Sequence, residues 1–145
     1  MGRYFFGLVM FLAGMLSALQ PPVNAALARR ANSITATAIN FGVGLMVLAL
    51  VGAASGQLKL GGVRGAPWWQ LTGGLLGAVF VLSTVVFLPR LGATALIAAL
   101  MGGQLTGAVL IDRFGVAGLP VVAPTFARMA GIVLLVAGGA LVIRR

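Results

Sequence analysis

The sequence predicts an all-α integral membrane protein with five transmembrane helices, and three observations support this. Of its 145 residues, 61% are hydrophobic and only 8% are charged, whereas a soluble domain carries about a quarter charged residues. The hydrophobic residues form five runs, each close to the length of about 20 residues that crosses a hydrocarbon core. The chain lacks the alternating strands of a membrane barrel, so its backbone groups must be paired within helices.

The predicted spans end at recognisable signals and leave no length for a soluble domain. Arg29 and Arg30 close the first span, and Ser33 is a plausible N-cap for the second. Trp68 and Trp69 suit the membrane interface at the start of the third. The single membrane domain, 1–145, is expected to hold spans at about 4–28, 33–54, 68–88, 91–111 and 124–143. An odd number of spans places the two termini on opposite sides of the membrane.

Several residue types are absent, and their absence narrows the chemistry. The chain has no cysteine, histidine or glutamate, and Asp112 is its only acid. Disulfides, cysteine nucleophiles and the usual soft-metal sites are therefore not expected, nor is any cofactor. The net charge of +9 comes from cations scattered through loops and ends, without the clustered face that nucleic-acid binding requires. We expect these cations to anchor the spans at the headgroups of the lipid bilayer.

The basic residues are balanced between the two sides of the predicted membrane. The N-terminal side has Arg3, Lys59, Arg64, Arg113 and Arg128, and the other side has Arg29, Arg30, Arg90, Arg144 and Arg145. An excess on one side normally fixes orientation, so a tie suggests insertion both ways and an inverted pair, an architecture that recurs in transporters. Chance or a partner chain also explains a tie, and placing Arg128 inside the fifth helix changes the count to four against five.

The stretch "LQPPVN" places amides and helix-breakers near the end of the first span. Gln20 and Asn24 are four residues apart and share a helical face, while Pro21 and Pro22 free backbone carbonyls near Ser17. A kinked helix with two amides on one side is a reasonable lining for a polar pocket. The alternative is the last turn of a helix at the headgroups, where amides are tolerated, and spacing alone does not separate the two.

Two further amides lie deeper in their spans, at Asn40 in the second and Gln104 in the fourth. Buried amides either hold helices together, contributing about 1 kcal/mol or less, or bind a substrate. Glycines beside Gln104 leave room for a ligand. Asp112 ends the fourth span next to Arg113, which favours a structural ion pair or helix-end contact over a proton site. The expected cavity is therefore polar and largely uncharged.

Small residues recur at helical spacing in the predicted spans. Gly131 and Gly138 are two turns apart on the last helix, and small residues let helix backbones approach closely in lipid. These two glycines are the preferred candidates for a dimer interface, and ordinary packing within the chain is the alternative.

Two segments, "LQPPVNAALARRANSITATAINFGVG" and "PRLGATALIAALMGGQLTGAVLIDRFG", resemble the small five-span YdcZ-type proteins of the drug/metabolite transporter superfamily. The resemblance covers nearly the whole chain, with the third and fifth spans fitting by length and glycine content. It implies a multi-pass bacterial inner-membrane exporter. Its relatives include four-helix transporters that pair antiparallel and ten-helix exporters that resemble two inverted five-helix units, so an antiparallel ten-helix homodimer is the expected assembly, with a heterodimer as the alternative. Its motifs mark as characteristic positions Gln20, Asn24, Asn40, Gln104 and Asp112. Related small multidrug transporters use a first-helix glutamate for cation exchange, which this chain lacks.

Three functions are consistent with the sequence. The favoured one is a small transporter that moves a small organic solute by alternating access, with Gln20, Asn24, Asn40 and Gln104 lining the cavity and Asp112 gating or coupling. The second is a non-transporting interaction subunit, or half of a hetero-oligomeric transporter. The third is a membrane enzyme or lipid translocase, which is disfavoured because no nucleophile motif is visible.

Overall fold

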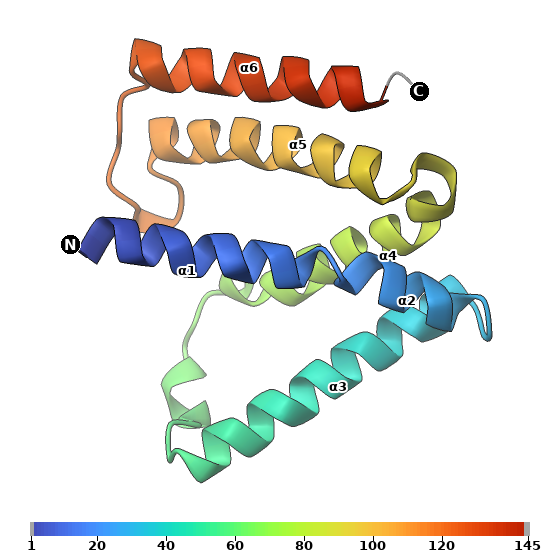
Figure 1. Cartoon of the computed structure of the whole chain (residues 1–145). Helices are drawn as coiled ribbons and strands as arrows, with labels where there is room; N and C mark the ends of the chain where they lie inside the picture. Colours follow the sequence, from blue (N-terminus) through green and yellow to red (C-terminus); the bar gives the residue numbers. More distant parts are fainter. Residues whose placement is uncertain (1, 144–145) are drawn as a thin grey trace. The chain divides into compact units, whose positions relative to one another are not determined.

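The computed structural model describes residues 2–143, and for Arg3 it describes the backbone alone. Within these residues all regular structure is helical (Figure 1). The α-helices are α1 (Gly2–Ser17), α2 (Gln20–Ala28), α3 (Ser33–Ala54), α4 (Gly73–Leu91), α5 (Ala93–Phe114) and α6 (Phe126–Ile143). Short 3-10 turns lie at η1 (Leu60–Val63), η2 (Trp68–Leu71) and η3 (Val116–Gly118).

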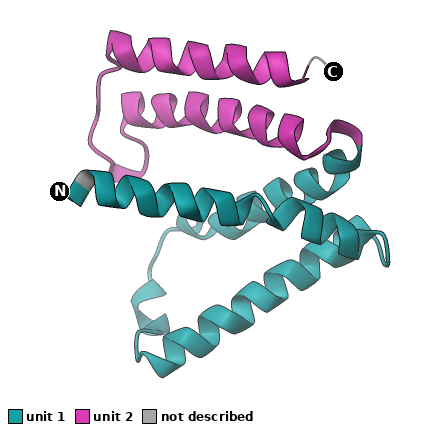
Figure 2. Ribbon diagram, viewed as in Figure 1, with its two compact units in different colours: residues 1–89 teal, residues 90–145 magenta. Residues whose placement is uncertain are grey.

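Within the described residues, five segments are long and apolar enough to cross a membrane, which confirms the predicted fold class. They are Tyr4–Ala28, Ser33–Ala54, Trp68–Leu91, Ala93–Phe114 and Phe126–Ile143. The chain separates into two compact units, residues 1–89 with α1 to α4 and residues 90–145 with α5 and α6 (Figure 2).

The first span is broken between α1 and α2, one turn before its two prolines. Pro21 and Pro22 have no N–H, so they cannot donate to the carbonyls four residues earlier. The last regular bond of α1 runs from the Ala18 N–H to the Gly14 carbonyl at 3.1 Å, and the Leu19 N–H turns back to Leu16. The prolines then lie in the first turn of α2, where a missing N–H is harmless.

A tight turn joins α2 to α3 in unit 1. The backbone N–H of Arg29 bonds to the Ala25 carbonyl and ends α2. Asn32, in extended conformation, accepts from the Thr35 N–H at 2.8 Å and is the N-cap of α3. The predicted cap at Ser33 was wrong by one residue. The two helices then pack through small buried positions, which include Ala25 on α2 and Ala36 on α3.

Four other predicted boundaries were displaced. The third span was expected to end at residue 88, but α4 continues through Pro89 to Leu91 because a proline this late removes only one helical bond. Gly92, with φ +75°, ends it, and α5 then runs from Ala93 to Phe114 rather than 91–111. The last helix begins at Phe126 rather than residue 124.

In unit 2, α5 and α6 run side by side (Figure 1). Glycines permit the approach: a Cβ on Gly139 would lie 3.4 Å from the Ala98 carbonyl oxygen, and one on Gly102 would lie 3.6 Å from Val136. The connection starts at Gly115, which is left-handed with φ +60°. A Cβ there would lie 2.9 Å from both the Leu119 carbonyl oxygen and a Val121 methyl group.

We predict that Gly115→Ala lowers the free energy of unfolding by about 1–3 kcal/mol, because the backbone is left-handed and the added methyl has no space. The matched control is Gly103→Ala, in an α5 position where a Cβ meets nothing within 4 Å. That variant should be as stable as the parent or more stable. Unfolding in detergent would measure both, and equal stabilities would contradict the role given to Gly115.

Candidate functional site

Gln20 and Asn40 meet between α2 and α3, although they are 20 residues apart in sequence. The Gln20 Nε2 donates to the Asn40 Oδ1 at 3.5 Å. Gln20 is eight residues from Ala28 and Asn40 is seven from Ser33, so both lie about 10–12 Å along their helices from the α2–α3 turn. The contact is long for a hydrogen bond, which leaves both amides with capacity for another partner.

Asn24 lies one turn from Gln20 on α2 and is only 5% exposed. Its Nδ2 is buried and has no hydrogen-bond partner among the described residues. The other buried polar side chains are paired within their own helices: Thr37 donates to the Ser33 carbonyl and Thr84 to the Val81 carbonyl, each at 2.8 Å. Burying a donor without a hydrogen-bond partner costs about 1–3 kcal/mol of folding free energy. The unpaired Nδ2 of Asn24 therefore calls for a functional explanation.

An apolar groove of about 320 Å³ lies between α3 and α4 within unit 1. It is lined by Ile34, Thr37, Ala38, Phe41, Ala78, Val79 and Leu82. At 3.6 residues per turn, Asn40 lies about 60° to one side of Thr37 on α3, and Phe41 about 40° to the other. On α3, Thr37 therefore lies between Asn40 and the groove-lining Phe41. Nothing in the spacing of these residues indicated this groove beforehand.

Gln104 belongs to unit 2 and lies at the midpoint of α5. Its side chain is exposed, and it makes no hydrogen bond to another described residue. It points about 120° around the helix from Ala98 and about 160° from Gly102, the two residues that meet α6. The neighbouring Gly103 and Gly107 have open space where a Cβ would stand. Gln104 thus presents an unpaired amide at mid-depth, on a face that α6 does not cover.

Asp112 pairs across the helices with Arg128, not with its neighbour Arg113 as the sequence suggested. The Arg128 Nη2 lies 2.7 Å from the Asp112 Oδ2. Asp112 stands near the end of α5 and Arg128 in the first turn of α6, so the pair fixes the same end of both helices. The pairing of Asp112 with Arg128 could have been inferred from the sequence, because consecutive antiparallel spans bring the end of one helix beside the start of the next.

The two interface candidates on α6 differ in their surroundings. Gly131 is half-buried and lines a groove of about 290 Å³ next to Asp112 and Arg128, within unit 2. Gly138 is exposed. A Cβ on either would meet nothing within 4 Å, whereas the adjacent Gly139 is the glycine that packs against α5. Gly131 and Gly138 therefore remain free for another partner, and their role in a dimer stays a prediction.

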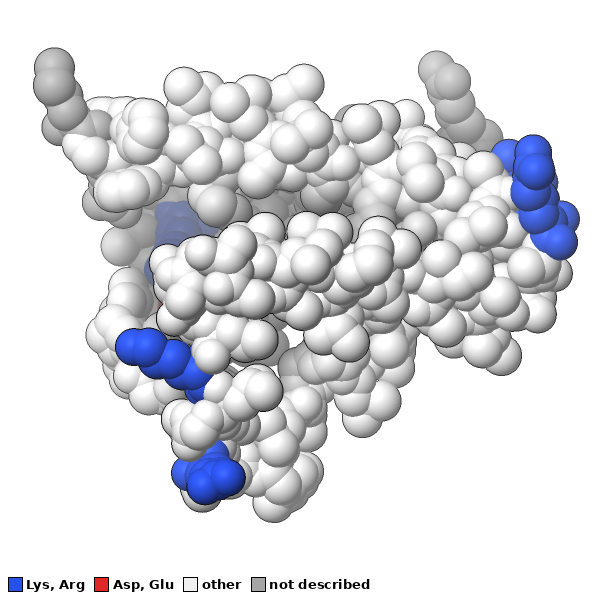
Figure 3. Space-filling model, turned by 90° about the horizontal axis from the view of Figure 1, so that it is seen from below, with Lys and Arg blue, Asp and Glu red and all other residues white. Residues whose placement is uncertain are grey.

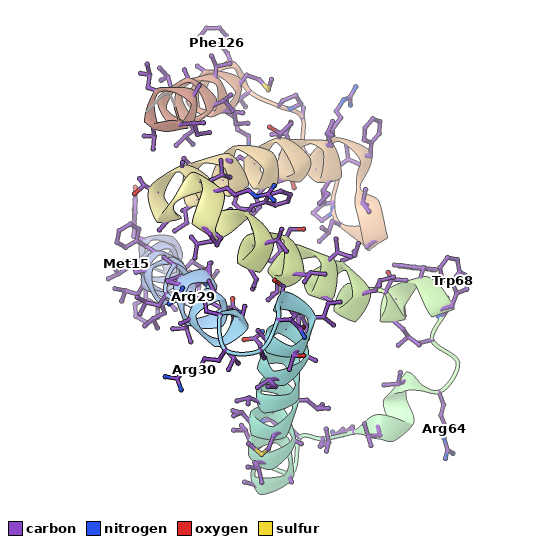
Figure 4. The ribbon with its side chains drawn as sticks, turned by 90° about the vertical axis from the view of Figure 1, so that its right-hand side faces the viewer. Met15, Arg29, Arg30, Arg64, Trp68 and Phe126 are labelled. Carbon is purple, nitrogen blue, oxygen red and sulfur yellow. The ribbon has the colours of Figure 1, made fainter. Side chains whose placement is uncertain are left out.

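The described cations lie at helix ends and connections. Figure 4 shows Arg29 and Arg30 where α2 turns into α3, and Arg64 and Trp68 on the segment before α4. In Figure 3 the basic side chains form a few small groups on a face that is otherwise uncharged. This distribution fits anchoring at headgroups. Among the described residues, no cluster of three or more metal-ligating side chains is present.

A family model described as "Putative inner membrane exporter, YdcZ" matches residues 5–141. The chain belongs to the YdcZ family. It is also 40% identical over 83 residues to the inner membrane protein YdcZ of Escherichia coli strain K12. That match covers 57% of this chain and 55% of the relative's length. No solved structure matches the chain.

Membership of the YdcZ family, together with five spans, places the chain in the inner membrane as a multi-pass protein. The family's description as an inner membrane exporter supports a transport role. The family match also covers the segments that contain all the polar residues described above.

We predict that Asp112 and Arg128 stabilise the α5–α6 pair by a coupling free energy of about 0.2–1 kcal/mol, the range measured for exposed ion pairs. A double-mutant cycle with Asp112→Asn and Arg128→Gln would measure it from unfolding in detergent. The matched control cycle replaces Arg128→Gln with Arg113→Gln and should give no coupling. Coupling through Arg113 instead would contradict the observed pairing.

Proposed function

We propose that the chain is a small secondary transporter that exports a small organic solute by alternating access, as an antiparallel dimer of ten helices. The observation that carries the proposal is the set of amides within the spans that lack good partners, above all the buried Asn24 Nδ2. Hydrocarbon cannot hydrogen-bond to such groups. A polar solute entering from water would satisfy them while bound and leave them free again after release.

The broken first span supplies a place for movement next to these amides. The Ser17 and Ala18 carbonyls have lost their helical donors to Pro21 and Pro22, so α1 and α2 can change their relative angle without breaking regular bonds. Broken helices beside a substrate site recur in secondary transporters. Gln20 lies directly at this break, so a change in angle would alter its contact with Asn40.

The pairing of two inverted copies is supported by the balanced loop charges and by Gln104. A mid-span amide facing lipid is unfavourable, and a second copy would cover it. Because Gln104 lies at the midpoint of α5, inverted copies bring their Gln104 residues to the same depth. Gly131 and Gly138, open on α6, would let the second copy approach closely. The Asp112–Arg128 pair would gate one end of α5 and α6.

The exposed Gln104 is also consistent with a second function, in which the chain is one half of a hetero-oligomeric transporter or a non-transporting subunit. Its partner would then be a different protein of opposite orientation. Purification of the chain with a stoichiometric second protein would favour this reading over the homodimer.

The test is Gln104→Leu in proteoliposomes. A panel of labelled organic acids, amides and amines would first identify the solute with the largest flux above empty liposomes. We predict that Gln104→Leu lowers this flux about tenfold or more, the loss expected when a ligand group is left unpaired, while the chain remains dimeric by cross-linking. Gln70→Leu, an exposed amide on η2, is the matched control. Normal flux through Gln104→Leu would exclude Gln104 from the site.

A further inference from the structure

We infer that the solute bound between α2 and α3 is an organic carboxylate with an apolar tail, and not an organic cation. This inference rests on the proposed transport function and names the substrate class. It follows from three features of unit 1: a buried donor without a partner, the sign of the surrounding charge, and the apolar groove beside the amides.

The first feature is the chemistry of the unpaired group. The buried atom of Asn24 is the amide nitrogen, which donates hydrogen bonds and cannot accept them. Its complement is an acceptor oxygen on the solute. Gln20 is one turn away on the same face, and its own N–H donors are held only by the 3.5 Å contact with Asn40. Two amide donors on one face are suited to the two oxygens of a carboxylate.

The second feature is the charge around the site. The only acid of the chain is Asp112 in unit 2, so residues 1–89 contain no acid. The α2–α3 turn carries Arg29 and Arg30, and five residues, about 8 Å of helix, separate Asn24 from Arg29. Both arginines are exposed at the turn (Figure 4). Their field attracts an anion and repels a cation at this end of α2 and α3.

The third feature is the groove between α3 and α4. Six of its seven lining residues are apolar, and the seventh, Thr37, uses its hydroxyl on the Ser33 carbonyl. Asn40 lies one turn from Thr37 on the adjacent face of α3. A solute held by its carboxylate at Gln20 and Asn24 would extend past Thr37 and lay an apolar tail in the groove, whose volume of about 320 Å³ suits a small organic group.

The experiment compares three matched series by thermal unfolding of the full chain in detergent. Butyrate, benzoate and 4-phenylbutyrate are tested against the corresponding amides and against the corresponding ammonium compounds. We expect the carboxylates to raise the unfolding temperature by roughly 2–5 °C near saturation, more for phenylbutyrate than for butyrate, and the ammonium compounds to have no effect. No shift with any carboxylate, an equal shift with the amides, or a shift with the ammonium compounds would overturn the inference.

Three variants test whether the carboxylate binds at the amides and the groove of unit 1. Asn24→Leu should abolish the carboxylate shift without lowering the unfolding temperature itself, because it removes a donor that has no partner in the chain. Gln70→Leu should keep the shift. Ala78→Phe, which fills the groove, should remove the extra shift of phenylbutyrate and keep that of butyrate. A full carboxylate shift in Asn24→Leu would overturn the site.

These measurements distinguish failure of the carboxylate inference from failure of the proposed transport function. Carboxylate binding without flux in proteoliposomes would support the inference about the site and remove the transport function. Flux of organic amines without carboxylate binding would support transport and overturn the substrate class.

Discussion

The structure depends on one constraint: within the hydrocarbon, a polar group has no partner except another group of the protein. Four hydroxyl groups in the spans meet this constraint locally. Thr37, Ser83, Thr84 and Thr106 all donate to a carbonyl three or four residues earlier in their own helix. The amides do not. Gln20 and Asn40 share one long contact, while the Asn24 Nδ2 and the Gln104 side chain have no partner among the described residues.

The amides of unit 1 lie beside a break in a helix and near an apolar groove. Gln20 is at the break between α1 and α2, which two prolines require. Asn40 lies one turn from Thr37, which lines the groove between α3 and α4. Amides that can accept another hydrogen-bond partner, a break in a helix and an apolar groove therefore occur together within unit 1. This combination is what binding and release of an amphipathic solute requires.

Much of the fold could be predicted from sequence because span length and apolar content are set directly by the bilayer. The boundaries were less accurate, since several local signals compete. Asn32 and Ser33 are both good caps, and only the extended backbone at Asn32 decides between them. Pro89 indicated an end, but it lies within the last turn of α4, where its effect is small.

The candidate site could be predicted only in part, because residue type was visible and pairing was not. The amides were recognisable as unusual in apolar spans. The Gln20–Asn40 contact joins positions 20 residues apart, and the partner of Asp112 is Arg128 rather than the adjacent Arg113. These pairings depend on how consecutive helices pack, which composition and spacing do not contain. The groove has no sequence signal at all, since its lining residues are ordinary for a membrane helix.

The central claim is that two inverted copies form the working unit, since one copy leaves the mid-span Gln104 without a partner. The chain has no cysteine, so a single cysteine reports orientation. At Gly2 a Cβ makes only an ordinary contact, 3.5 Å from Phe6, and at Gly61 it has open space. Two spans separate these positions, so both cysteines must report the same side of the membrane.

The most direct measurement is labelling of Gly2→Cys in intact cells with a membrane-impermeant maleimide, before and after permeabilisation, with Gly61→Cys as its matched control. Two-way insertion predicts that about half of each cysteine reacts from outside and the rest only after permeabilisation. Labelling of both cysteines wholly from one side would contradict the inverted homodimer.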